Sequence, residues 1–95
     1  MLGTGRFVRG KRVILYVAGS SGPPRAGFAA GRKIGGAVKR NRARRLLREA
    51  WRRLGPDVRD GYELVLVAQP TIDGAKANDV ISEVYDLLQR AGVGA

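Results

Sequence analysis

Cysteine and histidine, two residue types that dominate active-site chemistry, are both missing from this sequence. Without cysteine the chain forms no disulfide, thiolate metal site or thiol nucleophile. Without histidine it lacks the usual acid–base residue near neutral pH. The eight carboxylates are scattered, and Gly35-Gly36 stands in no nucleotide-binding fingerprint. We therefore expect no catalytic residue, no metal ligand and no cofactor bound by the protein alone.

Long hydrophobic runs are also missing. No stretch approaches the roughly 20 apolar residues of a membrane span, and the first residues lack the apolar segment of a signal peptide. We expect a cytoplasmic protein with no membrane partner, and no obligate protein partner is evident. The 95 residues, 44% of them hydrophobic, predict one globular domain over residues 1–95.

Acidic residues are scarce relative to basic ones. Eight Asp and Glu stand against 18 Lys and Arg, a net charge of +10. Residues 32–53 hold ten of the basic residues and one acid, a net charge of +9, so the rest of the chain is nearly neutral. Ordinary protein surfaces intersperse both signs. A block of positive charge this dense predicts a polyanionic partner.

The longest periodic stretch is predicted to be a helix over residues 37–54. Apolar residues recur there at helical spacing: Ala43, Leu46, Leu47, Ala50, Trp51 and Leu54. The arginines fall on the other side of such a helix, and Gly55-Pro56 is a suitable stop. Trp51 could be a base-stacking platform, but its helical position favours a core residue.

Strand and turn signals flank this helix. Residues 13–18 form a β-branched apolar run, residues 19–24 a Gly, Ser and Pro turn, and residues 26–30 a weaker strand candidate. Residues 62–68 are apolar enough to predict a central strand nearly buried on both faces. A last helix is predicted over residues 77–91, with Asn78 as N-cap and Asp79, Glu83 and Asp86 on its outer side. This order predicts an α/β sandwich.

Residues 27–50 contain a run of motifs at fixed spacing. The segment joins a basic pair, Arg32-Lys33, to a Gly-x-Ala-Val element at residues 35–38 and an Arg-Asn-Arg motif at residues 40–42, with further basic residues following. This combination resembles the signature of the bacterial ribonuclease P protein family. Residues 13–16, 62–70 and 77–91 resemble the flanking strands and the final helix of the family, so the likeness covers most of the chain. Residues 6–10 resemble the end of its first helix.

The resemblance implies a fold: a two-layer α/β sandwich like the second domain of ribosomal protein S5, a small sheet with packed helices and a left-handed crossover. It also implies a function. The protein would be the non-catalytic subunit of an endoribonuclease ribonucleoprotein. It would bind ribonuclease P RNA and the 5′ leader of precursor tRNA, while the RNA, with magnesium, removes the leader.

Site residues follow from the same resemblance. The implied RNA-binding residues are Arg32, Lys33, Lys39, Arg40, Asn41, Arg42, Arg44, Arg45, Arg48 and Arg52. Phe7 and Tyr16 match aromatic residues that line a cleft for the single-stranded leader, although either could equally be a plain core residue. Aromatic side chains suit such a cleft because every base has a face to stack on.

The sequence departs from the family pattern in several places. The chain begins late, so we expect the first helix to be truncated and residues 1–5 to be frayed. Gly31 and Gly36 replace the usual serine and asparagine of the motif, and Gln69 stands where an arginine often precedes Pro70.

Four other functions compete with this interpretation. A ribosomal or other RNA-binding protein would explain the charge but not the Arg-Asn-Arg spacing. A DNA-binding helix-turn-helix protein would need helices where residues 13–18 and 26–30 predict strands. A membrane-bound amphipathic helix would need Leu46, Leu47 and Trp51 free to insert. A stand-alone protein nuclease would be active without RNA.

Overall fold

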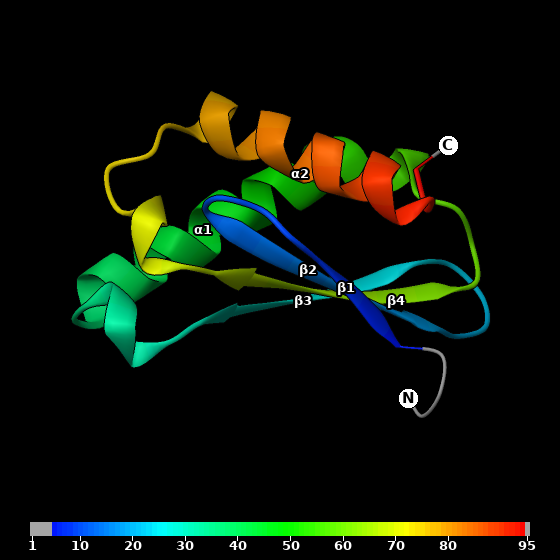
Figure 1. Cartoon of the computed structure of the whole chain (residues 1–95), viewed down its shortest axis with the longest axis horizontal. Coiled ribbons are helices and arrows are strands. Elements are labelled where there is room, and N and C mark those ends of the chain that lie inside the picture. The colour runs from blue at the N-terminus through cyan, green and yellow to red at the C-terminus, as the bar shows by residue number, and fades with distance from the viewer. Residues whose placement is uncertain (1–4, 95) are drawn as a thin grey trace.

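The computed structural model describes residues 5–94 as a sheet covered by two helices (Figure 1). Most of the predicted frayed segment, residues 1–4, lies outside the described residues. The strands are β1 (Arg6–Arg9), β2 (Val13–Gly19), β3 (Arg25–Ala30) and β4 (Tyr62–Ala68), and the helices are α1 (Ala37–Leu54) and α2 (Ala77–Ala91). Short 3₁₀ turns η1 (Arg32–Ile34), η2 (Gly55–Asp57) and η3 (Pro70–Ile72) complete the chain. The predicted bounds of both helices are confirmed.

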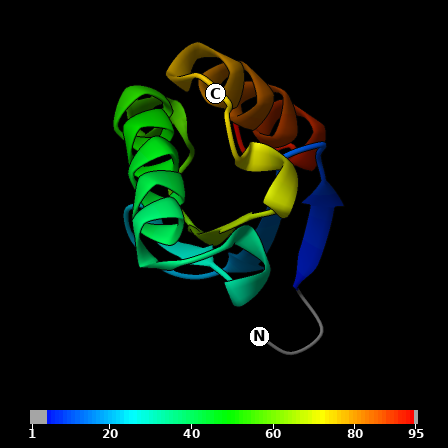
Figure 2. The ribbon, with the colours of Figure 1, turned by 90° about the vertical axis from the view of Figure 1, so that its left-hand side faces the viewer.

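The four strands form one mixed sheet in the order β1-β2-β4-β3. The β1–β2 and β2–β4 pairs are antiparallel, and the β3–β4 pair is parallel. Both helices lie over the same face of this sheet, α1 beside α2 (Figure 2). The result is the two-layer α/β sandwich that the sequence predicts.

The connection from β3 through α1 to β4 is left-handed. In Figure 2 the helices lie above the sheet and β1 lies to the right, so the strand order places β3 to the left of β4. Both of these strands run toward the viewer in that view, since they point to the left in Figure 1. The chain rises from β3 into α1 and descends to β4 on the right, which confirms the predicted handedness against the usual right-handed rule.

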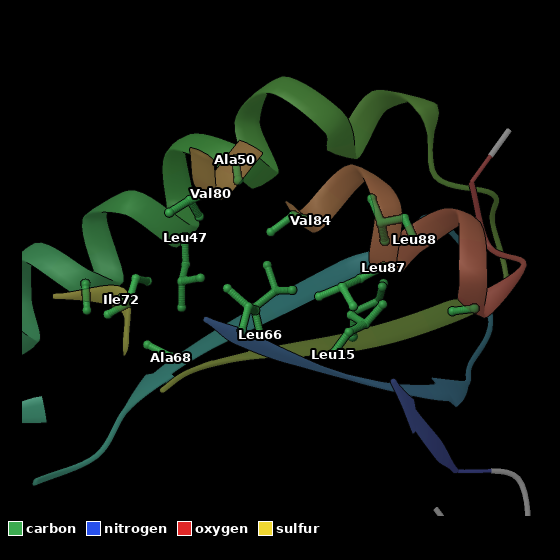
Figure 3. Close-up of a cluster of buried hydrophobic side chains, with 14 of the residues drawn as sticks. Leu15, Leu47, Ala50, Leu66, Ala68, Ile72, Val80, Val84, Leu87 and Leu88 are labelled. Carbon is green, nitrogen blue, oxygen red and sulfur yellow. The ribbon is translucent and has the colours of Figure 1, made fainter. Parts of the chain in front are cut away.

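The core lies between the sheet and the two helices (Figure 3). Leu15 from β2 and Leu66 from β4 are at most 1% exposed and face Leu47 from α1 and Val84 and Leu87 from α2, all 0% exposed. Such buried aliphatic side chains each contribute about 1.5–3 kcal/mol through removal of apolar surface from water. The predicted apolar face of α1 therefore docks on the core, and Trp51 packs against its margin.

Among residues 5–94 no helix covers the opposite face of the sheet, which corrects the prediction that residues 62–68 are buried on both faces. Along β4, Leu64, Leu66 and Ala68 are buried, but Val65 is 38% exposed and Glu63 is exposed. The sequence misled us here because Val65 and Val67 are apolar, as in a central strand. They instead form part of an apolar open face.

Residues 6–10 were predicted to be the end of a helix, and this prediction is wrong. Residues 6–9 form strand β1, paired with residues 14–17 of β2. The backbone groups of β1 find their partners in β2, and Arg6 Nη2 donates a hydrogen bond to the carbonyl of Ala91 (2.5 Å) at the end of α2.

Two details of α2 also differ from prediction. The N-cap is Lys76, not Asn78, and the Lys76 backbone N–H donates to the Asp79 carboxylate (3.3 Å). Glu83 does not lie on an outer acidic surface, because its side chain is only 12% exposed and faces the β1–β2 turn. Within residues 5–94, neither helix combines the length and apolar character that spanning a membrane requires.

Candidate nucleic-acid interface

Helix α1 begins after a pair of glycines, of which the backbone requires only the first. Gly35 has φ 135°, a conformation that other residues rarely adopt, and Gly36 is the N-cap without a side-chain hydrogen bond. The first turn of α1 contains no acidic residue, so its free N–H groups and positive dipole end face solvent next to basic side chains. Arg52 and Arg53 in the last turn complement the negative end of the helix dipole.

One row of arginines lies on the side of α1 that faces β3. Arg40, Arg44 and Arg48 follow one another at intervals of four residues, which places them on one side of a helix. The guanidinium carbon of Arg48 lies 5.8 Å from the centroid of the Phe28 ring in β3, a cation–π contact. Arg44 Nη2 donates to Asn41 Oδ1 (2.5 Å). This row is held in position by protein contacts while its charge remains available.

Arg40 has an unusual environment within this row. Its Nε atom is buried and has no hydrogen-bond partner among the described residues. A buried N–H without a partner is costly, since desolvation is not repaid by a hydrogen bond. Because the Nε atom itself is buried, an external acceptor would reach it only after the Arg40 side chain moved.

The outer side of α1 is also basic. Arg45, Arg48 and Arg52, with Glu49, line a hollow of about 310 Å³. Arg52 Nη2 donates to Glu49 Oε1 (2.6 Å), which partly neutralises that end of the surface. For Arg45, residues 5–94 provide no hydrogen bond or ion pair, so its charge is free for an external anion.

Two of the predicted RNA-binding residues point elsewhere. Lys39 Nζ forms an ion pair with Asp73 (3.2 Å), and Arg42 Nη2 donates to the carbonyl of Ala75 (3.0 Å). Both partners lie in the segment between η3 and α2. Lys39 and Arg42 therefore join α1 to this connection, on the side away from the arginine row.

The basic pair lies at the same end of the molecule as the start of α1. Arg32 and Lys33 form the exposed part of η1, directly after β3, while Ile34 is buried beneath them (6% exposed). The buried Ile34 fixes the turn against the core, so both cations face solvent. Together with the arginine row, they extend the basic surface along the β3 edge of the molecule.

Phe7 and Tyr16 come together on the open face of the sheet. They are direct partners in the β1–β2 pair, their ring centroids lie 5.7 Å apart, and the ring planes are tilted by 35°. Phe7 is 56% exposed and Tyr16 is 44% exposed, so neither is a core residue. Tyr16 is in turn the register partner of Val65 in β4, and the three side chains form an apolar row across the sheet.

This row borders a groove of about 460 Å³, which we call the open-face groove. Its lining is Gly5, Arg6, Phe7, Tyr16, Val17, Ala18, Glu63 and Val65. The sequence identified Phe7 and Tyr16 but missed Arg6, Glu63 and Val65. Successive side chains of a strand point to opposite faces of the sheet, so the sequence of residues 62–68 could have shown that Glu63 and Val65 share a face. Only the register with β2 shows that this is the same face as Tyr16.

These features define the class of small, basic two-layer α/β proteins with an arginine-rich crossover helix. The family model described as Ribonuclease P matches residues 1–92. The chain therefore belongs to the ribonuclease P protein family.

Curated relatives agree with this assignment. The ribonuclease P protein component of Symbiobacterium thermophilum is 44% identical over 93 residues, covering 94% of this chain and 79% of that protein. The one from Pelotomaculum thermopropionicum is 39% identical over 90 residues, covering 94% and 80%. The likeness extends over nearly the whole chain and is not confined to the basic motif.

Solved structures show the same fold. The ribonuclease P protein of Staphylococcus aureus superposes with a TM-score of 0.84 at 19% identity, covering 96% of this chain and 84% of that one. The protein from Thermotoga maritima gives a TM-score of 0.81 at 22% identity, covering 90% and 83%. The arrangement of helices and strands is thus preserved although most residues differ.

Proposed function

We propose that this chain is the protein subunit of ribonuclease P and uses two surfaces for two RNA segments. Family membership already implies a role in tRNA 5′ processing together with the ribonuclease P RNA. The finer proposal is that the basic surface of α1 and η1 binds the ribonuclease P RNA, and that the open-face groove binds the 5′ leader of precursor tRNA.

The arginine row of α1 is the observation that carries the first part. Arg40, Arg44 and Arg48 lie in line on a helix whose apolar side is fixed to the core, so the guanidinium groups are presented by a rigid element. Planar guanidinium groups donate in pairs to phosphate oxygens and stack on bases. Arg32, Lys33, Arg45 and Arg52 add charge around this row. A folded RNA offers phosphates at comparable spacing.

The open-face groove supports the second part. Single-stranded RNA is bound by aromatic platforms combined with basic residues along the backbone. Phe7 and Tyr16 supply such platforms, and Val65 extends the apolar floor. The Arg6 side chain points to the helix side of the sheet, where it donates to the Ala91 carbonyl, so the basic residue nearest the groove is Arg25, the ion-pair partner of Glu63. The groove lies on the face of the sheet opposite the helices. One protein could therefore hold the leader while α1 engages the catalytic RNA.

The chemistry is assigned to the RNA in this proposal. The protein acts as a non-catalytic subunit that binds, positions and screens charge, and magnesium belongs to the RNA complex. Within residues 5–94, no group of three or more His, Cys, Asp and Glu side chains is placed to hold a metal ion. A cytoplasmic location, where precursor tRNA is made in bacteria, completes the proposal.

A binding experiment tests the first surface. The purified protein is titrated onto a fluorescently labelled bacterial ribonuclease P RNA, with an unrelated structured RNA of equal length as competitor. The proposal predicts that the competitor displaces the protein only at a large excess. Equal displacement by both RNAs would show that the protein binds polyanions in general and does not recognise ribonuclease P RNA.

A further inference from the structure

The open-face groove contains one residue that simple charge attraction does not explain. Glu63 lines the groove next to Val65 and Tyr16 and places a carboxylate in a site proposed to receive a polyanion. A carboxylate there repels phosphate groups and weakens general RNA binding. Besides its exposed ion pair with Arg25, this carboxylate offers two acceptor oxygens to a base in the groove, which an apolar or basic residue would not.

We infer that Glu63 reads the base identity of the RNA segment in the groove and selects guanine. This inference rests on the proposed leader-binding function of the groove. It adds a specificity-determining residue to the aromatic platforms, which by themselves accept any base.

The register of the sheet places Glu63 at the right distance from the platforms. Phe7, Tyr16 and Val65 form one row across the open face, and Glu63 lies two residues before Val65 on the same face of β4. Residues two apart on a strand are separated by about 7 Å. A base stacked on Tyr16 would therefore direct its edge, rather than its face, toward the Glu63 carboxylate.

The carboxylate is also available. Its ion pair is with Arg25 Nη2 at 3.6 Å, longer than a hydrogen bond, and the two side chains are 52% and 70% exposed. Exposed pairs of this kind are weak and readily exchanged. Among residues 5–94 the Glu63 carboxylate accepts no hydrogen bond, so both oxygens are free for a ligand.

Guanine fits this acceptor better than the other bases do. Its Watson–Crick edge presents two adjacent donors, N1–H and the N2 amino group, which match the two oxygens of one carboxylate. Adenine and cytosine each place one amino group beside a ring nitrogen that repels the carboxylate. Uracil places its single N3–H between two carbonyl oxygens. The groove should therefore prefer guanine, and uracil should bind least well.

The test uses the protein assembled with a bacterial ribonuclease P RNA. A series of precursor tRNAs is prepared with all-uridine leaders, each carrying one guanosine at a different leader position. The dissociation constant of each precursor tRNA is measured for the wild type and for Glu63→Gln. Asp86→Asn removes the same charge from α2, on the other side of the sheet, and is the matched control. Tyr16→Ala reports whether the groove holds the leader at all.

We expect one leader position at which guanosine improves affinity about tenfold over uridine in the wild type and the Asp86→Asn control. Glu63→Gln should abolish most of that preference while binding the all-uridine leader no more weakly than the wild type. If Tyr16→Ala weakens leader binding but guanosine has no effect at any position, or its effect survives Glu63→Gln, the inference is wrong and the groove function stands. If Tyr16→Ala leaves leader affinity unchanged, the guanine selection by Glu63 and the leader-binding function of the groove are both wrong.

Discussion

The Glu83 carboxylate is joined to Arg12 by two of the hydrogen bonds that fix the β1–β2 turn. Glu83 Oε2 accepts from the backbone N–H groups of Arg12 (2.7 Å) and Val13 (2.9 Å), and Oε1 accepts from the Arg12 guanidinium (3.2 Å). Gly10 lies directly against this carboxylate, where a Cβ would approach Glu83 Oε2 to 2.5 Å. Glu83 is thereby one of the side chains, with Gln69 and Thr71, that hold the turn positioning β1, and with it Phe7.

We predict that Glu83→Ala lowers the free energy of unfolding by about 2 kcal/mol, because it removes charge-assisted hydrogen bonds and leaves two backbone N–H groups without their acceptor. Urea denaturation followed by circular dichroism measures the change. Asp86→Ala on the same helix breaks only an exposed ion pair with Arg90 and should cost less than about 0.5 kcal/mol. Equal costs for the two variants would show that the Glu83 contacts do not secure the turn.

The basic side of α1 yields a prediction about salt dependence. Replacing Arg44 and Arg45 by alanine should weaken binding to ribonuclease P RNA. The slope of log affinity against log salt concentration should become less steep by about two, one for each lost phosphate contact. Arg59→Ala with Arg90→Ala removes the same charge outside α1 and is the control. If both double variants change the slope equally, net charge rather than the α1 surface determines binding.

Arg42 is predicted to contribute to stability, unlike Arg45. Arg42→Ala removes the hydrogen bond to the Ala75 carbonyl and should cost about 1 kcal/mol of unfolding free energy. Arg45→Ala should leave stability within about 0.5 kcal/mol of the wild type, since surface substitutions away from such contacts have little effect. Thermal or urea unfolding measures the stability of both variants. A larger loss of unfolding free energy for Arg45→Ala than for Arg42→Ala would contradict the stabilising role given to Arg42.

The aromatic pair should affect only substrates that carry a leader. Phe7→Ala or Tyr16→Ala should weaken binding of precursor tRNA to the assembled complex by about 1–3 kcal/mol, because each removes a stacking surface. Binding of mature tRNA should not change. Tyr85→Ala removes another exposed aromatic residue, from α2 (55% exposed), and should affect neither substrate. A loss of mature tRNA binding in the Phe7 or Tyr16 variant would argue against a leader site.

The sequence predicted those elements whose pattern is set by local periodicity. The spacing from Ala43 to Leu54 gave the bounds and the buried side of α1, and the stop at Gly55-Pro56 was correct. The sequence-based prediction failed where residues distant in the chain determine the secondary structure or the burial of a segment. Residues 6–9 are a strand because β2 pairs with them, and Val65 is exposed because no helix within the described part of the chain covers the second face of the sheet.

The candidate site was predictable to a similar extent. The motif identified the basic residues of α1, but only the structure separates the row beside Phe28 from Lys39 and Arg42, which contact the segment before α2. Helical periodicity places these residues around the axis without saying what lies on each side. Glu63 was missed because a lone carboxylate on an apolar strand carries no motif, and its place in the groove depends on the register with β2.

The central claim, that this chain is a working subunit of ribonuclease P, is tested most directly by reconstitution. The purified protein is mixed with a bacterial ribonuclease P RNA and a precursor tRNA at low magnesium concentration, and release of the 5′ leader is followed. The account predicts rapid cleavage at the mature 5′ end only when the protein and the RNA are both present. Leader cleavage by the protein alone, or a rate with the RNA that the protein does not change, would contradict it.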